Sequence, residues 1–299
     1  MTPLVFHPIY SQLPLPPRHR FPIEKYQGIR DALVARGITS DRFSAPSPVS
    51  SAFLTDYFAP NYVNALVSGV LDDKAMRRIG FPWSEHLIKR SLTAVAGTIL
   101  TAELAIEHGQ ALNLTGGYHH AFADFGSGFC LFNDLFLAAK TMQKYGHIDN
   151  VLIIDLDVHQ GDGTAKLAQD DKSIFTLSIH GEKNFPHRKQ HSDLDIGLAK
   201  GTGDDEYLET VEQALLLAER QFQPDAIIYD AGVDIHENDD LGHLCISTEG
   251  VYQRDKMVYD FCRALDVPVA GVIGGGYQRD IDALVNVHLQ LYRAFGVID

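Results

Sequence analysis

The chain has 299 residues, of which 45% are hydrophobic, enough for one domain over residues 1–299 to bury a large core. It carries 39 acidic and 25 basic residues, a formal net charge of -14, which disfavours direct nucleic-acid binding and favours cationic partners. No apolar stretch reaches the roughly 18 residues that span a bilayer, and the start lacks the features of a secretion signal. We therefore expect a cytoplasmic protein that does not bind membranes.

Strands and helices are predicted to alternate along most of the chain. In chain order, we expect a strand at 3–6, helices at 23–36 and 85–107, a strand at 111–114, a helix at 133–145, strands at 150–156 and 173–179, a helix at 204–220, and strands at 225–230 and 269–273. This alternation predicts an α/β fold: a single-domain, open, mostly parallel sheet with helices on both faces. The segment 181–203 is too long for a plain connection and is predicted to form a wall of the active site.

Polar residues follow four of the expected strands. The segments are Asp155–Gly163, Thr115–His120, Asp230–Asp234 and the glycine turn Gly274–Tyr277. In an open parallel sheet, ligands bind outside the carboxyl ends of the strands. The four segments are therefore expected to converge on one pocket.

Three residues of these segments fit a catalytic zinc site. Alternation along a strand would place Asp155, Asp157 and His159 on one face. Zinc needs three protein ligands drawn from His, Cys and carboxylate, with one position open. Asp157, His159 and Asp234 match that requirement, with iron(II) as another divalent ion that the site would accept.

The remaining polar groups suit proton transfer. Two carboxylates reduce the acidity of water at the metal, so a separate general base is needed, and His119 with His120 can act as base and acid. Asp155 and Asp162 are expected to fix their tautomers and to separate their pKa values. Tyr277 would donate its hydroxyl to the carbonyl oxygen as charge develops. The constellation predicts metal-assisted amide hydrolysis.

These motifs resemble one family along essentially the whole chain. The matching segments are His19–Pro22 with Lys25–Tyr26, Gly116–His120, Ser127–Cys130, Asp155–Gly163, Asp234 and Gly274–Tyr277. Together they resemble the zinc-dependent histone deacetylases and their bacterial relatives of the acetoin-utilisation type, most closely the small class IV-like group. Gln160 and Tyr118 depart from the common pattern, where histidine and tryptophan are frequent.

The resemblance implies roles for individual residues. It makes Asp157, His159 and Asp234 the zinc ligands, His119 and His120 the catalytic pair, and Tyr277 the residue that polarises the carbonyl. It further implies an acyl-lysine tunnel lined by Gly128, Phe129, Phe185 and Gly275. A structural monovalent cation, usually potassium, would bind near Asp155, Asp157, His159, Ser178 and Ile179.

The expected substrate is an acylated lysine in a protein or peptide, or an acylated polyamine. Acyl chain length and oligomeric state stay open. Two other functions are alternatives. A ureohydrolase with two manganese ions would need extra aspartates around His159, where Gln160 and Gly161 stand. A non-catalytic acyl-lysine reader would be favoured by loss of Tyr277 or a metal ligand, and all are present.

Overall fold

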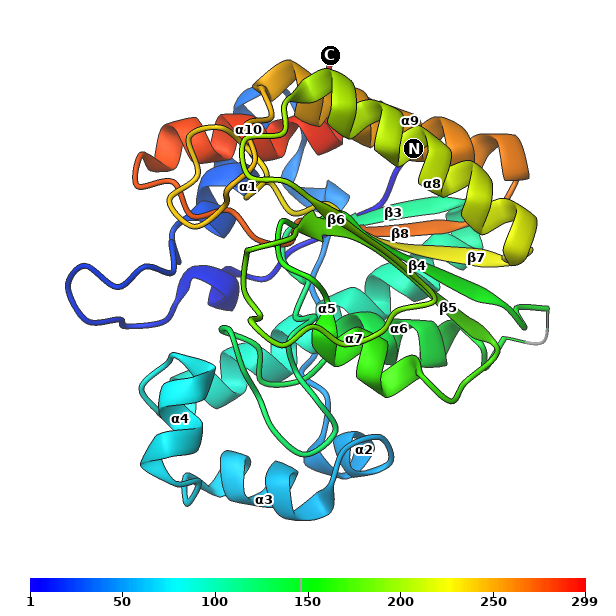
Figure 1. The fold of residues 1–299 in the computed structure, drawn as a ribbon. Coiled ribbons are helices and arrows are strands. Elements are labelled where there is room, and N and C mark those ends of the chain that lie inside the picture. The colour runs from blue at the N-terminus through cyan, green and yellow to red at the C-terminus, as the bar shows by residue number, and fades with distance from the viewer. Residues whose placement is uncertain (146) are drawn as a thin grey trace.

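In the described part of the chain, eight strands form one parallel sheet. The structure is a computed structural model that describes residues 1–145 and 147–299. The strand order is β2-β1-β3-β8-β7-β4-β5-β6 (Figure 1). The strands are β1 (Leu4–Val5), β2 (Phe43–Ser44), β3 (Gln110–Asn113), β4 (Val151–Asp155), β5 (Ile174–Gly181), β6 (Leu194–Leu198), β7 (Ala226–Asp230) and β8 (Val269–Val272). The predicted α/β sheet is confirmed, and within the described residues every pairing is parallel.

Ten α-helices accompany the sheet in the described part of the chain. They are α1 (Lys25–Ala35), α2 (Ser51–Thr55), α3 (Pro60–Ser68), α4 (Asp73–Ile79), α5 (Glu85–His108), α6 (Asp134–Met142), α7 (Asp162–Ala168), α8 (Asp204–Gln221), α9 (Thr248–Leu265) and α10 (Ile281–Ala294). Helices α5, α6 and α7 pack on one face, and α1, α8, α9 and α10 cover the other (Figure 1). The expectation of helices on both faces is confirmed.

The central strands are apolar on both sides because both faces are covered. In β4, Val151 and Ile153 pack in the layer beneath α5 and α6, while Leu152 and Ile154 join the larger core on the opposite face. A parallel strand buried on both faces reads as a continuous hydrophobic run, as this one does. The polar side chain of Asp155 therefore marks the point where the strand leaves the core.

Helix ends follow local capping chemistry. The Ser84 side chain accepts a hydrogen bond from the Leu87 amide at the start of α5, and Gly109, with φ 82°, ends it. The predicted helix at 133–145 is shorter than expected, since α6 ends at Met142 and turns follow. No described helix is long and apolar enough to cross a membrane.

Several elements of the fold were not predicted from the sequence. Helices α2, α3 and α4 come between β2 and α5 in the chain. They form a separate layer below α5 in Figure 1. The segment 181–203 contains β6, which extends the sheet as its last strand, next to β5. Leu194 and Ile196 alternate with exposed residues in β6, the pattern of an edge strand that is half covered.

Candidate active site

Four neighbouring strands deliver the candidate residues to one edge of the sheet. β3, β8, β7 and β4 are adjacent, and each is followed by one of the four polar segments. Because the strands are parallel, their carboxyl ends lie at the same edge. The expected convergence is therefore observed.

Asp157, His159 and Asp234 form a buried group. Each offers a ligand atom, and these atoms lie within 4.8 Å of one another. Two backbone amides hold the carboxylates: Gly275 N–H donates to Asp157 Oδ2 at 2.8 Å, and Val158 N–H donates to Asp234 Oδ1 at 2.9 Å. A Cβ at Gly275 would come within 2.6 Å of both carboxylates, so only glycine fits there. Gly275, expected along the tunnel, thus lies against the floor of the site.

The charge of this group favours a cation. Burial and the nearby Asp157 raise the pKa of Asp234 to about 7. Burial alone would lower the pKa of His159, but its hydrogen bonds to Asp157 and Asp234 raise it to about 10. The two carboxylates therefore draw a positive charge between them, which the His159 proton supplies and which a divalent ion would supply in its place; the donor set of two carboxylates and one imidazole is one that zinc accepts. The residues present fit such an ion.

Asp155 belongs to a different group from Asp157 and His159. We expected these three side chains on one strand face, but β4 ends at Asp155, so strict alternation does not continue to 157 and 159. Asp155 instead joins His119 and Asp230 in a second buried group whose candidate ligand atoms lie within 4.8 Å of one another. The turn after β4 separates the two groups.

The adjacent histidines His119 and His120 each bond a different carboxylate. His119 Nδ1 lies 2.8 Å from Asp155 Oδ2, and His120 Nδ1 lies 2.7 Å from Asp162 Oδ1. Their ring centroids are 4.1 Å apart, and His119 Nε2 is 3.9 Å from Asp157 Oδ1. A carboxylate at Nδ1 makes that nitrogen the donor, which leaves Nε2 free to accept a proton when the ring is neutral.

The same two histidines differ in proton affinity. Burial lowers the pKa of His120 to about 4, and the positive charge of His119 acts in the same direction. For His119, burial opposes protonation, but Asp155 and Asp157 outweigh it and raise its pKa well above the usual value. One ring is therefore neutral and the other cationic, as an acid and base pair requires.

Tyr277 stands at the side of this site. Its ring centroid is 6.3 Å from that of His159, and its amide donates to Asp239 Oδ2 at 2.7 Å. Burial and the charges of the aspartates hold the pKa of its phenol well above 10, so the hydroxyl stays a donor. The Lys25 ammonium lies 5.8 Å from the Tyr277 ring and donates to the Gly274 carbonyl at 3.0 Å, which steadies the glycine turn.

The aromatic residues expected along the tunnel border the histidines and the tyrosine. The Phe185 ring meets His120 edge-on at 4.8 Å between centroids, and Phe129 lies 6.0 Å from Tyr277. A Cβ at Gly128 would lie 2.5 Å from the His120 ring, and its φ is 51°. The backbone at Gly128 therefore passes directly over His120, where no larger side chain fits.

Gln160 ties the wall segment 181–203 to the strand end. Its side-chain nitrogen donates to the Gln190 carbonyl at 2.8 Å and to Asp195 Oδ1 at 2.7 Å, and its oxygen accepts from the Gln190 amide. Both N–H groups and the oxygen of the Gln160 side-chain amide are thus bonded to residues of the segment 181–203. This residue, which departs from the family pattern, anchors the segment that carries Phe185.

Residues expected to hold a monovalent cation lie beside the histidine pair. Asp155 in β4 is paired in register with Ser178 in β5, and Ile179 follows, fully buried. The Ser178 hydroxyl contacts His180 Nδ1 at 3.0 Å. Potassium at this position stays a prediction.

Sequence reasoning gave no role to Lys25 or Asp230, which both lie inside quoted motifs. Asp230 is fully buried, and neither carboxylate oxygen has a hydrogen-bond partner among the described residues. It lies 3.8 Å from His119 Nδ1 and directly against the backbone of Gly117 and Gly274. The available signal for Asp230 was an acid directly after an apolar run, at the start of the segment Asp230–Asp234, but only the fold shows that it faces the His119 ring.

Comparison with known proteins decides the family. Residues 19–291 match the histone deacetylase domain. This chain belongs to the histone deacetylase family. The family is typically metal-dependent, and its members are deacetylases, which accords with the buried group of Asp157, His159 and Asp234.

Relatives of this histone deacetylase family member span bacteria and plants. An uncharacterised protein of Picosynechococcus sp. is 48% identical, with 98% of this chain and 97% of that protein covered. Histone deacetylase 2 of Arabidopsis thaliana is 34% identical over 87% of this chain and 70% of its own length. The acetoin utilization protein AcuC of Bacillus subtilis is 35% identical over 62% of this chain, which spans about half of that protein.

Solved structures share the fold. A histone deacetylase homolog from Aquifex aeolicus has a TM-score of 0.83 at 22% identity, covering 99% of this chain and 84% of its own. A homolog complexed with SAHA has a TM-score of 0.81, also at 22% identity, covering 100% of this chain and 89% of its own. At that identity the likeness speaks for the fold.

Proposed function

We propose that this protein is a zinc-dependent deacylase that removes acetyl or longer acyl groups from lysine side chains or related amines. The observation that carries the proposal is the buried group Asp157, His159 and Asp234 beside two histidines of opposite proton affinity and a protonated tyrosine. These three residues would hold zinc or iron(II), which supplies Lewis-acid polarisation of the amide carbonyl and acidifies water.

The protein groups then perform the proton transfers. His120, neutral with Nε2 free, takes the proton of the attacking water as the carbon–oxygen bond forms. Cationic His119, whose ring centroid is 4.1 Å from that of His120, places a positive charge near the tetrahedral centre as negative charge develops there. The Tyr277 hydroxyl donates to the developing oxyanion. The carbon–nitrogen bond then breaks, the proton passes to the leaving amine, and a carboxylic acid and a free amine result.

Carboxylates behind the histidines position them for these steps. Asp155 and Asp162 fix the donor nitrogen of each ring, and a potassium ion near Asp155, Ser178 and Ile179 would hold the strand ends that carry the first of them. An acylated polyamine is the alternative substrate for the same chemistry.

Full-length protein loaded with zinc or iron(II) tests the function. It would be assayed for acid release from acetyl-lysine peptides, longer acyl-lysine peptides and acetylpolyamines, with Asp234→Asn as the matched inactive variant. We expect hydrolysis of at least one acyl-lysine peptide. Binding of these peptides without hydrolysis above the Tyr277→Phe background would replace the deacylase with a reader.

A further inference from the structure

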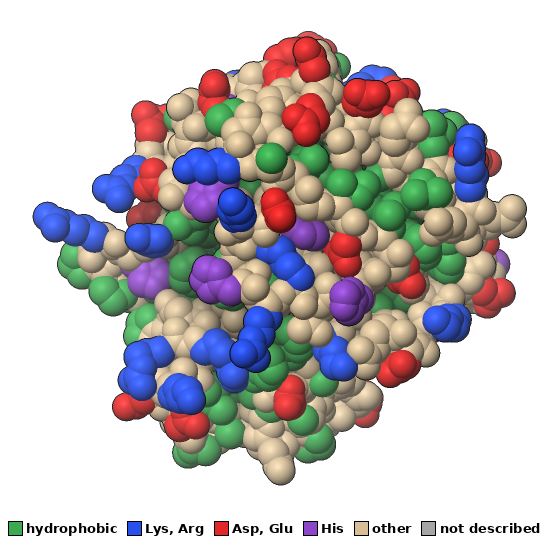
Figure 2. Space-filling view, viewed as in Figure 1, with side chains coloured by type: hydrophobic (Ala, Val, Ile, Leu, Met, Phe, Trp, Pro, Cys, Tyr) green, Lys and Arg blue, Asp and Glu red, His purple; other side chains and the backbone are tan. Residues whose placement is uncertain are grey.

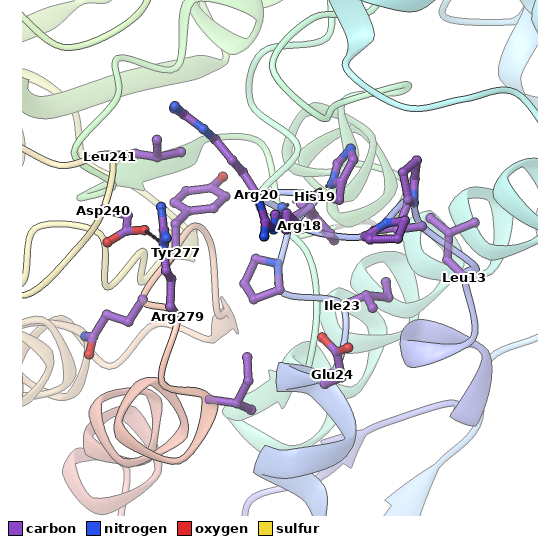
Figure 3. A pocket seen from close by; sticks show the side chains of 17 residues that line it. Leu13, Arg18, His19, Arg20, Ile23, Glu24, Asp240, Leu241, Tyr277 and Arg279 are labelled. Atoms are coloured by element: carbon purple, nitrogen blue, oxygen red, sulfur yellow. Dashed lines mark hydrogen bonds and ion pairs between the residues drawn. The ribbon is translucent and has the colours of Figure 1, made fainter.

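We infer that the substrate carries a carboxylate on the amine side of the scissile bond, at the outer end of the stem that bears the acylated amine. The inference rests on the proposed function and names its substrate class more closely. It comes from a pocket of about 860 Å³ outside the buried site, between the N-terminal loop and the loops at 240–241 and 277–281. Figure 3 shows Arg18 and Arg20 on the loop across the opening from Asp240, Leu241 and Tyr277.

Tyr277 connects the outer pocket to the chemistry. The same side chain lines the outer pocket and the small inner cavity that contains His119 and His120. The acyl carbonyl must lie at the floor, within reach of the tyrosine hydroxyl. The amine stem and whatever bears it then extend outward past Tyr277. The part of the substrate that reaches the pocket is therefore the amine portion rather than the acyl chain.

The pocket has the opposite charge from the molecule as a whole. Its lining includes three arginines, Arg18, Arg20 and Arg279, against two acids, Glu24 and Asp240. Arg279 is already paired with Asp240 at 2.7 Å. Neither Arg18 nor Arg20 forms an ion pair within residues 1–145 and 147–299, and both are exposed. Two guanidinium groups thus remain available at the mouth of a protein whose net charge is -14.

Basic side chains also lie in the segment that carries Phe185, which lines a pocket other than the one with Arg18 and Arg20. Exposed His187 and Arg188 line a second pocket, which Phe185 also lines. The Lys189 ammonium donates to the carbonyls of Asn184 and Pro186 and holds this loop in place. Figure 2 shows Lys, Arg and His side chains gathered on the left half of this face.

The arginines of the outer pocket disfavour cationic substrates, which the net charge of the whole protein would favour. The formal charge of -14 favours cationic substrates such as polyamines, but charges farther away than a Debye length of roughly 8 Å are screened in physiological salt. Groups at the mouth act at shorter range. A cationic polyamine would meet two unpaired arginines, whereas a carboxylate would find donors suited to it.

Matched substrates test the inference. Three acetyl-lysine peptides would carry Glu, Gln or Lys beside the acetylated residue, and kcat/KM would be measured at low salt and in 0.5 M salt. Exposed ion pairs are worth little each, so we expect a Glu-to-Lys preference of about five- to tenfold that shrinks in high salt. Arg18→Gln with Arg20→Gln should bring the ratio close to one, and Arg20→Glu should reverse it.

Arg220→Gln is the matched control. Arg220 lies in the last turn of α8, near the amino ends of the strands and therefore on the side of the sheet away from the site. Its substitution should leave the Glu-to-Lys preference as in wild type. A second pair of substrates, free Nε-acetyl-lysine and its α-amide, separates a small molecule with its own carboxylate from an acidic peptide. A preference in either pair that depends on the arginines supports the inference.

Two results overturn it while leaving the proposed function standing: equal kcat/KM for all charge variants, or a preference that survives the double arginine substitution. If no acylated substrate is cleaved, the proposed function fails instead. Dissociation constants of the same peptides, measured by fluorescence anisotropy, would then still test the pocket, because binding there does not require turnover.

Discussion

The floor of the site and its mouth are built by different means. On the floor, Asp157 and Asp234 are almost wholly buried and receive backbone hydrogen bonds from neighbouring strand ends. At the mouth, Arg18 and Arg20 lie exposed on a proline-rich loop. The contrast teaches that the sheet fixes the chemistry, while loops set which substrate reaches it. Changes to the floor should lower turnover of every substrate, and changes to the mouth should alter their ranking.

The strongest test of the floor removes a metal anchor. Asp157→Asn or Asp234→Asn should reduce bound metal and lower turnover about 1,000-fold or more on all substrates, since only three protein anchors are expected. Metal content by mass spectrometry and acid release measure this. Asp225→Asn is the control, because Asp225 also accepts two backbone amides, but at the opposite edge of the sheet. Normal metal content in an Asp157, His159 and Asp234 triple variant would contradict the assignment.

Loss of the phenol should come next in size. Tyr277→Phe removes one oxygen, and turnover should fall by about 100- to 1,000-fold because a transition-state hydrogen bond is lost, while KM changes little. Tyr259→Phe, on the outer helix α9, should leave both constants unchanged. An effect confined to KM would move Tyr277 from the chemistry to substrate binding.

The histidine pair should have a somewhat smaller effect. His119→Ala and His120→Ala should each cost roughly 100-fold in turnover with metal content near normal. In wild type, turnover should fall in acid as His120 takes up a proton and fall in base as His119 loses one, which gives a bell-shaped pH profile. Near-normal rates in both variants would mean that neither ring transfers a proton.

The smallest effect concerns the stability of the floor. Burial, helped by the charge of Lys189, lowers the pKa of His180 to about 4. In the unfolded state His180 takes up a proton near pH 6.5, whereas in the folded protein it does so only near pH 4. The free energy of unfolding should therefore decrease as the pH falls below 6.5, by about 1–2 kcal/mol at pH 5. Denaturant unfolding at pH 7 and pH 5 measures the loss, and His180→Gln should reduce it. His187→Gln, at an exposed position, should leave this loss unchanged. If the two variants lose the same amount of unfolding free energy between pH 7 and pH 5, His180 is not the cause.

Sequence patterns predicted many of the central strands and helices, because apolar runs and helix-ending glycines are local features of the chain. The apolar run at 151–154, fully buried in β4, and the glycine after α5 are both visible without any fold. The long helix 85–107 was predicted to within one residue at its end. The short strands β2 and β6 and the helices α2 to α4, α7, α9 and α10 were not predicted. The shortest of these elements owe their stability to packing on neighbours rather than to their own periodicity.

The sequence by itself determined the kinds of chemistry available and the segments that supply them. Acids, histidines and glycines just past apolar runs limit the choice to a few metal-dependent reactions, since ligand type and strand-end position are local properties. Tertiary structure alone decided that Asp155 faces His119 while Asp157 faces His159, and that Lys25 supports the turn before Tyr277. It also placed two arginines at the mouth of an acidic protein. These pairings join residues far apart in the chain, and their geometry follows from strand order and burial, which no short sequence pattern records.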